Sequence, residues 1–146
     1  MKKIVFIFFV FGVLSCKIYR ERVIKFKPYK SDCEYSFLVP GGYQEKRILG
    51  DHEYQQEYWY SDSIVLYITT FRNTFNYEIM REQGVYYDRF EALNSGDTIT
   101  LKGTNKTGLY WKDKLIENGI TIGYSNVPSE KIGEFDKAVL SIKKIK

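Results

Sequence analysis

The strongest hydrophobic pattern is an unbroken apolar and β-branched run at positions 64–70, Ile-Val-Leu-Tyr-Ile-Thr-Thr. Both faces of such a strand are apolar near its centre, which predicts an interior strand covered on both sides. The run before it alternates, with Tyr54, Gln56, Tyr58 and Tyr60 on one face and Gln55, Glu57 and Trp59 on the other. Because Ser61-Asp62-Ser63 between the two runs is typical of a turn, the sequence predicts a β-hairpin.

Five shorter runs predict further strands, at residues 23–26, 35–39, 98–102, 109–112 and 120–124. The second of these ends at Pro40-Gly41-Gly42, a clear turn. Asn118-Gly119 stands between the last two runs, and both residues tolerate the positive φ of a type I′ turn. We therefore expect an antiparallel sheet built from hairpins and a meander.

A C-terminal helix is predicted from apolar residues that recur three, four and seven positions apart: Ile132, Phe135, Ala138, Val139 and Ile142. Lys143, Lys144 and Lys146 would then complement the negative end of its dipole. Gly133 costs about 1 kcal/mol inside a helix, so the first turn is expected to be loose.

The middle of the chain also carries helical signals. Asn73 is suited to cap a helix that runs to about Gln83, with Gly84 as its C-terminal stop. Residues 85–93 show helical spacing as well, although a strand there remains an alternative.

These elements predict an α+β fold, in which a C-terminal amphipathic helix and a helical middle segment pack on an antiparallel β-sheet. No repeat or low-complexity linker divides the chain, so we expect one globular domain over residues 34–146.

The N-terminus has the pattern of an export signal. Lys2 and Lys3 precede an apolar run at residues 4–14, which as a helix would reach only about 16 Å and is too short to cross a bilayer. Such a run followed by a small residue is typical of a signal peptide, here residues 1–15. Residues 16–33 are then expected to form a tether and the first strand.

The tetrapeptide Val13-Leu14-Ser15-Cys16 resembles the lipobox of bacterial lipoproteins, in which the cysteine thiol is acylated and becomes the new N-terminus. This resemblance implies a cell-envelope protein held on the membrane by palmitate-type chains at Cys16. Lys17, rather than Asp, follows the cysteine, so by analogy with lipoprotein sorting nothing there indicates retention at the inner membrane, and we expect the outer membrane. The alternative is an ordinary signal peptide, which would allow a Cys16–Cys33 disulfide.

Charge excludes one class of partner. Without Lys2 and Lys3 the net charge of +4 falls to about +2, too small to favour binding to nucleic acid. Residues 17–30 nevertheless hold six cations and only one acid. Beside a lipid anchor they could approach anionic headgroups, but a solvated tether leading into the first strand is favoured, because apolar residues interrupt the cations without a helical stripe.

No catalytic motif is present, and we expect neither an enzyme nor a cofactor. His52, the single histidine, lies between Asp51 and Glu53, but a metal site needs more ligands at defined spacing. Cys33 has no base nearby in sequence, and no G-x-S-x-G elbow occurs. The carboxylate pairs Glu53 with Glu57 and Asp97 with Asp113 carry no sign of a cleft.

Aromatic residues are abundant at 17% of the chain. Tyr54, Tyr58, Trp59 and Tyr60 could present a flat surface to a sugar, a peptide or a protein, or they could pack within the sheet. Two other short patterns, at Ser63 and Thr98, resemble the Asp-Ser/Thr-aliphatic acceptor of bacterial O-glycosylation.

The order of predicted elements over residues 34–143 resembles the PsbP-like α/β fold, and residues 123–128 are similar to the ends of small bacterial lipoproteins. Neither resemblance implies a catalytic residue. The sequence therefore favours a non-enzymatic, lipid-anchored envelope protein that binds a protein partner, as an immunity or inhibitor protein or an accessory subunit. The alternative is a small-ligand or glycan-binding module that uses strand 54–60.

Overall fold

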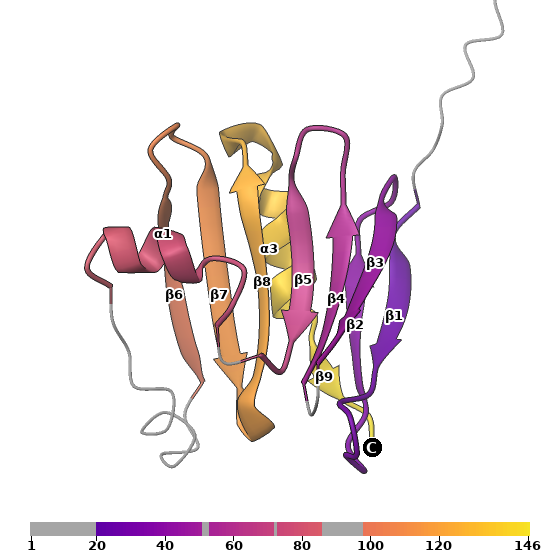
Figure 1. Ribbon diagram of the computed structural model, residues 1–146. Helices are drawn as coiled ribbons and strands as arrows, with labels where there is room; N and C mark the ends of the chain where they lie inside the picture. The colour runs from indigo at the N-terminus through magenta and orange to yellow at the C-terminus, as the bar shows by residue number, and fades with distance from the viewer. Residues whose placement is uncertain (1–19, 51–52, 72, 86–97) are drawn as a thin grey trace, which may run out of the picture.

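Two antiparallel sheets dominate the computed structural model, which describes residues 20–50, 53–71, 73–85 and 98–146 (Figure 1). The larger sheet has the order β3 (Gln44–Leu49), β4 (Tyr54–Trp59), β5 (Val65–Thr69), β8 (Ile120–Val127), β7 (Tyr110–Ile116) and β6 (Ile99–Thr104). The smaller sheet has the order β1 (Arg22–Phe26), β2 (Tyr35–Val39) and β9 (Lys143–Lys144).

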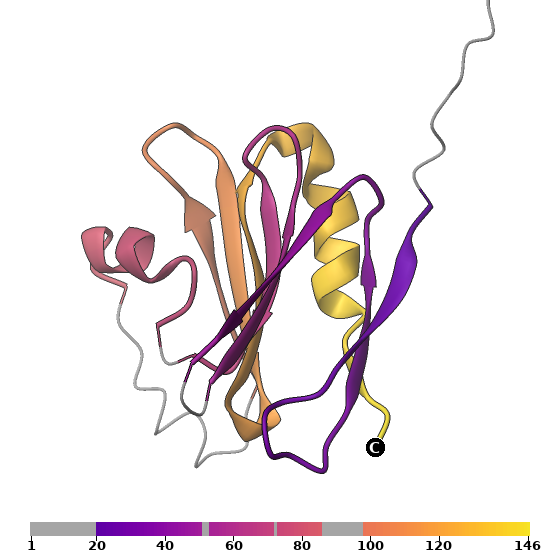
Figure 2. The same cartoon turned by 45° about the vertical axis from the view of Figure 1, so that its right-hand side comes forward.

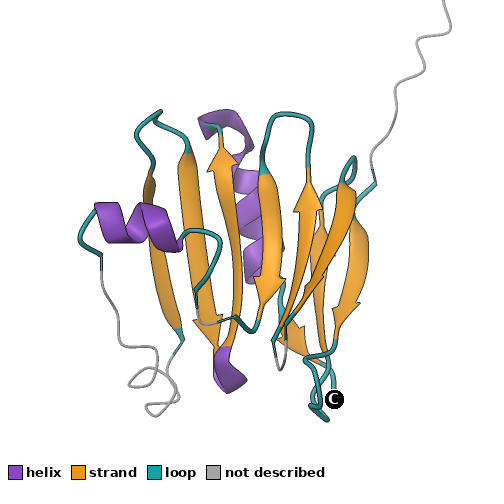
Figure 3. Cartoon of the chain, viewed as in Figure 1, coloured by secondary structure: helices purple, strands orange, loops and turns teal. Residues whose placement is uncertain are grey.

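Two α-helices lie on opposite faces of the six-stranded sheet, α1 (Tyr77–Glu82) on one and α3 (Ile132–Leu140) on the other (Figures 1 and 2). Two single turns of 3₁₀ helix, η1 (Glu117–Gly119) and η2 (Ser129–Lys131), complete the described elements. Strands clearly outweigh helices (Figure 3), so the β-rich, antiparallel part of the prediction is confirmed.

The predicted hairpin of residues 54–60 and 64–70 is confirmed as β4 and β5, which pair antiparallel from Trp59 opposite Val65 to Gln55 opposite Thr69. All five residues of β5 are buried. The interior strand expected from its apolar run therefore lies near the middle of the larger sheet and is covered on both faces.

The β7–β8 hairpin is also present, but its turn differs from the prediction. The connection is the 3₁₀ turn η1 rather than a two-residue type I′ turn, and Gly119 takes a positive φ of 71°. The strong hairpin signal at Asn118-Gly119 thus located the turn without fixing its type.

The C-terminal helix is confirmed as α3, which buries Phe135, Ala138 and Val139. The expected role of the final lysines is wrong. The helix ends at Leu140, and Lys143 and Lys144 form the short strand β9 beside β2. The backbone of Glu34 pairs with Ile145 and Lys146, so extended pairing replaces a further helical turn.

The helical middle segment is not borne out. Between Asn73 and Gln83 the structure has only the six residues of α1, because Thr74 and Asn76 direct their side chains to Asp113 on the sheet. Asn73 does not cap the helix; Asn76 occupies that position without a side-chain cap bond. The helix or strand expected at residues 85–93 lies almost wholly outside the described residues.

The strand β3 was not predicted. It forms an edge of the larger sheet, and most of its residues are exposed. The first strand, expected at residues 23–26, is confirmed as β1, which pairs with β2 along its whole length.

The hydrophobic core fills the space between the two sheets. It contains Phe26 and Phe37 of the smaller sheet, Ile68 and Ile122 of the larger sheet, and Phe135 of α3. α3 packs against both β2 and β8 and lies between the two layers (Figure 2). Its Asp136 pairs with Lys112 of β7 and accepts a hydrogen bond from the Tyr124 hydroxyl (2.9 Å), which fixes the helix on the sheet.

Candidate functional site

The two tyrosines of β4, Tyr54 and Tyr58, face the core rather than solvent. Tyr58 is fully buried and contacts Phe37 edge-on. Tyr54 stacks on Phe26 at 5.3 Å between ring centroids, and Tyr60, just beyond the strand, packs on Phe135 at 5.2 Å. These three tyrosines do not form the flat exposed surface that a sugar-binding site requires, and cross-strand packing accounts for them.

Trp59 lies on the opposite face of β4 and is half-buried. Its indole Nε1 donates to Glu57 Oε2 (2.6 Å), and its ring packs edge-on against Phe75 at 5.6 Å. Trp59 therefore packs against the segment that precedes α1, on the opposite side of the sheet from the three tyrosines.

The two predicted glycosylation positions are accessible. Ser63 is exposed in the turn between β4 and β5, where it has a positive φ of 60°, and Thr98 is exposed just before β6. Cys16, Asp51 and His52 lie outside the described residues. Cys33 is half-buried against the core, and its backbone N–H donates to Ser31 Oγ (3.0 Å).

A row of polar residues crosses the face of the larger sheet that α1 covers. In the strand register Lys46 lies opposite Glu57, Glu57 opposite Tyr67, Tyr67 opposite Gly123 and Gly123 opposite Asp113. We call Glu57, Tyr67, Gly123 and Asp113, with Thr74 and Asn76 above them, the buried polar row. Each of these residues is buried.

Asp113 is the centre of the buried polar row. Its carboxylate accepts hydrogen bonds from the Tyr67 hydroxyl, from Thr74 Oγ1 (2.6 Å) and from Asn76 Nδ2 (2.7 Å). Burial nevertheless raises the pKa of Asp113, since the three donors offset only part of the loss of hydration. Burial and the nearby carboxylate also hold the pKa of Tyr67 well above its usual value, so the phenol stays protonated.

Gly123 makes the contact between Tyr67 and Asp113 possible. A Cβ at this position would lie 2.5 Å from Asp113 Oδ1 and 2.7 Å from the Tyr67 hydroxyl. The two side chains therefore meet over a position where any side chain would collide with them.

Glu57 is the second enclosed carboxylate of the row. It accepts hydrogen bonds from Gln55 Nε2 (2.5 Å) and from Trp59 Nε1, and Lys46 Nζ lies 3.9 Å away at the exposed edge. Like Asp113, it is surrounded by donors of the protein itself. The buried polar row thus ties the segment before α1 to the sheet and presents no reacting group to solvent.

Several buried polar atoms near the row have no hydrogen-bond partner in the described structure: Asn76 Oδ1, Trp111 Nε1, Thr121 Oγ1 and Ser125 Oγ. Thr121 and Ser125 flank Gly123 at alternate positions of β8 and so face α1. The face under α1 is consequently far more polar than the face under α3.

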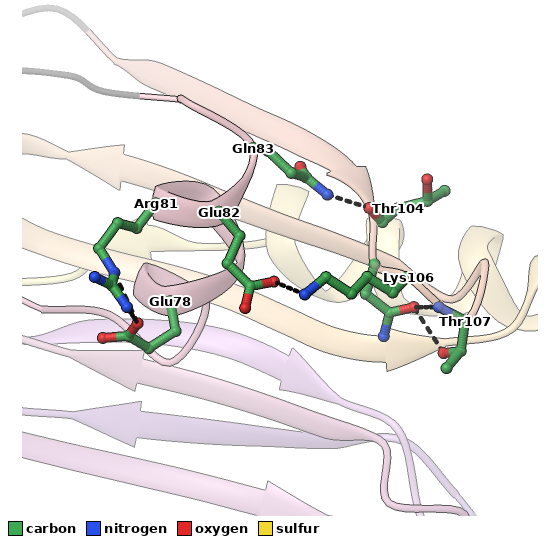
Figure 4. A network of polar contacts seen from close by, with 8 residues as sticks. Glu78, Arg81, Glu82, Gln83, Thr104, Lys106 and Thr107 are labelled. Carbon is green, nitrogen blue, oxygen red and sulfur yellow. Dashed lines mark hydrogen bonds and ion pairs between the residues drawn. The ribbon is translucent and has the colours of Figure 1, made fainter.

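A surface pocket of about 230 Å³ lies where α1 meets the β6–β7 turn, lined by Ile79, Glu82, Gln83, Asn105, Lys106 and Thr107. We call it the α1–turn pocket. Glu82 and Lys106 point toward one another across it (Figure 4), with Nζ 2.8 Å from the carboxylate. Gln83 Nε2 donates to the carbonyl of Thr104 (2.5 Å), so α1 is fastened to the end of β6.

The turn side of the α1–turn pocket is shaped by Asn105. Its Oδ1 accepts hydrogen bonds from the backbone N–H of Thr107 (3.0 Å) and of Leu109 (3.0 Å), and from the Thr107 hydroxyl (2.8 Å). These bonds hold the turn in one conformation. The pocket therefore offers an aliphatic floor at Ile79 beneath a rim of amides, a hydroxyl and one ion pair.

The sequence analysis named Asp113 and Glu57 only as members of two carboxylate pairs, with Asp97 and with Glu53, and did not bring them together with Tyr67, Thr74 and Asn76. A signal was present, because Trp111, Asp113 and Leu115 alternate and place the carboxylate on the same face as two large apolar residues. The α1–turn pocket has no comparable signal, since it joins segments more than twenty positions apart.

Within the described ranges, no three His, Cys, Asp or Glu side chains gather closely enough to hold a metal ion. Neither described helix has the length and apolar character that crossing a bilayer requires. Comparison with protein-family models, curated proteins and solved structures gave no match.

Proposed function

We propose that the protein is a lipid-anchored bacterial cell-envelope protein that binds a protein partner and acts without catalysis. The anchor hypothesis rests on the apolar run at residues 4–14 and on Val13-Leu14-Ser15-Cys16, whose cysteine would be acylated. β1 begins at Arg22, about six residues later, which limits an extended connection to about 20 Å. The folded domain would thus stay close to the bilayer.

The α1–turn pocket is the observation that supports the proposed binding of a protein partner. At about 230 Å³ it is smaller than the roughly 300–1000 Å³ of typical small-molecule sites. Its aliphatic floor and polar rim suit one side chain or a short loop of another protein. α1 and β6 lie at the opposite end of the molecule from β1 (Figures 1 and 2), so an anchored domain could present the pocket to a partner.

This proposal keeps both partner classes expected from the sequence, an immunity or inhibitor protein and an accessory subunit of an envelope complex. It also keeps the outer membrane as the proposed location. We do not carry the glycan-binding alternative forward, because Tyr54, Tyr58 and Tyr60 pack into the core.

The anchor is tested by the intact mass of the protein purified from its native membrane. We expect the mass of residues 16–146 plus acylglyceryl chains. An unmodified mass would contradict the anchor, and a Cys16–Cys33 disulfide would then be the first alternative to examine.

The partner site is tested by a photocrosslinking amino acid placed at Lys106 in living cells. Lys102 is the matched control, because it is an exposed lysine of β6 on the face away from α1. We expect one adduct of defined mass from position 106, none from position 102, and loss of the adduct when Ile79→Asp is added. Equal patterns at both positions would reject the pocket while leaving the anchor intact.

A further inference from the structure

Positive charge is concentrated on one side of the molecule. Residues 20–39 and 137–146, which form the smaller sheet and the end of α3, contain nine Lys and Arg but only three Asp and Glu. The whole chain has a net charge of only +4, so the remainder is acidic on balance. The fold brings together these two basic segments, which lie at opposite ends of the sequence.

The outward face of the smaller sheet follows from its register. Tyr35, Phe37 and Val39 point into the core, so Ser36 and Leu38 lie on the opposite face, where Ser36 is itself buried (4% exposed) and Leu38 is half-buried. Lys25 and Lys143 are the two cross-strand neighbours of Ser36, and both are exposed. The short serine is therefore flanked by a lysine on each side.

Exposed aliphatic residues share this face with the lysines. Val23 lies opposite Leu38 and is 66% exposed. The end of α3 lies alongside β2, since the backbone N–H of Leu38 donates to Ser141 Oγ (2.7 Å). Leu140, 68% exposed, follows Lys137 by three positions and so lies on the same side of the helix.

Lys137 shows which way that side of α3 points. Its Nζ lies 2.8 Å from the carboxylate of Glu21, the residue before β1, so the exposed side of α3 lies next to the start of β1. We call Val23, Lys25, Leu38, Lys137, Leu140 and Lys143 the basic face.

We propose that the basic face rests on the anionic phospholipid surface of the membrane, an inference that builds on the proposed anchor at Cys16. Lysines around exposed aliphatic side chains form the pattern of an interfacial membrane surface, in which the cations meet lipid phosphates and the aliphatic groups enter the headgroup layer. The ion pairs of Lys25 with Glu34 (4.0 Å) and of Lys137 with Glu21 are solvent-exposed, and such pairs hold their cations only weakly.

The geometry of attachment supports the same occupant. β1 is an edge strand of the smaller sheet and the first of the described elements, and it begins six positions after Cys16, so an acylated cysteine would keep the basic face within about 20 Å of the bilayer. At that range even weak attraction suffices, because the anchor supplies a high local concentration. The α1–turn pocket would then point away from the lipid.

The test is the labelling of individual lysines by a membrane-impermeant amine reagent. The acylated protein is reconstituted into phosphatidylcholine vesicles, or into phosphatidylethanolamine vesicles that contain phosphatidylglycerol. We expect the labelling of Lys25 and Lys143 to fall at least about fivefold on the anionic vesicles only, and to recover in about 1 M salt, where charges are screened beyond about 3 Å. Lys102 and Lys106 should label equally on both.

Controls separate the possible failures. Protein that does not sediment with phosphatidylcholine vesicles lacks the anchor, whatever its lysines do. Protein that sediments with both vesicles but labels equally on both keeps the anchor and overturns the basic face. Protection in native envelopes that is absent from anionic vesicles would mean that a protein covers this face, which also overturns the proposal.

A charge-reversal variant provides a second measurement. Lys25→Glu with Lys143→Glu changes two exposed side chains and should abolish the protection of Lys137 on anionic vesicles. Lys102→Glu with Lys131→Glu makes the same change in net charge elsewhere and should leave that protection intact. Equal behaviour of the two double variants would show that net charge, and not this face, governs the contact.

Discussion

Gly123 is required for the close contact between Tyr67 and Asp113. It lies on the central strand β8, between Tyr67 on one neighbouring strand and Asp113 on the other. The missing side chain lets a phenol and a carboxylate from non-adjacent strands meet above the sheet. Sheet interiors normally disfavour glycine, so its presence here reflects this close approach.

Substitution at Gly123 should therefore be costly. Gly123→Ala would force a Cβ against the carbonyl of Lys112, Asp113 Oδ1 and the Tyr67 hydroxyl. We expect the free energy of unfolding to fall by about 3 kcal/mol, measured by urea denaturation. Gly133→Ala is the matched control, because its Cβ in α3 would meet no atom within 4 Å apart from its own chain neighbours and helix backbone, and it should stabilise the protein by about 0.5–1 kcal/mol. A neutral effect of Gly123→Ala would show that the sheet relaxes freely there.

Asp113 should give the protein a particular dependence on pH. Burial raises its folded-state pKa above the ordinary value of 3.8, so between these two pKa values the folded state binds more protons than the unfolded state. The contribution of protonated Asp113 to the free energy of unfolding is therefore complete at pH values below its pKa in the unfolded chain. It is lost as the pH rises through its pKa in the folded protein.

The measurement is the difference in unfolding free energy between the wild type and Asp113→Asn, taken by urea denaturation across the acid range. We expect the wild type to lose stability relative to the variant from about pH 4 upward, by no more than about 1.4 kcal/mol per pH unit. The difference should level off above the folded pKa. A difference that grows in favour of the wild type would mean that the three donors outweigh burial.

At the scale of elements, α1 illustrates a helix that depends on side chains outside it. It has six residues and no side-chain cap bond, too few to be stable alone. Asn76 instead fastens it: Nδ2 donates to Asp113 Oδ1 (2.7 Å), to the Tyr67 hydroxyl (3.0 Å) and to the carbonyl of Tyr124 (3.0 Å). The other end is held by two exposed contacts, the hydrogen bond from Gln83 to the carbonyl of Thr104 and the ion pair of Glu82 with Lys106 (2.8 Å).

Loss of the hydrogen bonds of Asn76 should allow residues 73–85 to unfold locally before the sheet unfolds. For Asn76→Ala we expect a loss of about 2–3 kcal/mol, since hydrogen bonds to a charged group are lost from a buried site. Hydrogen exchange should show residues 73–85 losing protection while β5 and β8 keep it. Gln83→Ala, which removes the exposed bond, should change stability by less than about 0.5 kcal/mol. Equal losses of stability in Asn76→Ala and Gln83→Ala would show that Asn76 is not the main attachment of α1 to the sheet.

Elements with a regular apolar period could be predicted from the sequence. β5 and α3 were found because their side chains face one shared core, whose demands appear directly in the residue pattern. β3 was missed because an edge strand with Glu45, Lys46 and Arg47 resembles a solvated loop. β9 was missed because two residues carry no period, and its pairing with β2 joins residues about a hundred positions apart.

The candidate sites were harder to predict than the fold. The aromatic strand looked like a surface because Tyr and Trp are common in both interfaces and cores, and only the position of Phe26, Phe37 and Phe135 decides between the two. Asn76 and Asp113 are polar residues whose burial depends on each other, so neither reveals it alone. Such pairs become visible only when the strands are placed in register.

At the scale of the whole molecule, the two faces of the larger sheet have different roles. The face under α3 is apolar and joins the larger sheet to the smaller one, whereas the face under α1 is polar and holds a short cover segment. The proposed membrane contact and the proposed partner pocket then lie at opposite ends, on the smaller sheet and at α1 (Figures 1 and 2). A lipid-anchored protein that binds a protein partner needs this separation, because the partner must bind without displacing the lipid contact.

This arrangement makes the stability of the whole molecule depend on α3. Phe135 packs against Tyr60 at 5.2 Å and Tyr124 at 5.9 Å, within the one core cluster that contains residues of both sheets. Phe135→Ala should lower the free energy of unfolding by about 3–5 kcal/mol, from lost burial and the cavity left behind. Because both sheets share this core, tryptophan fluorescence and far-UV circular dichroism should report one coincident transition. Leu140→Ala on the exposed side of the same helix should cost less than about 0.5 kcal/mol. Two separate transitions in the Phe135 variant would instead show that the smaller sheet and the larger sheet unfold as independent units.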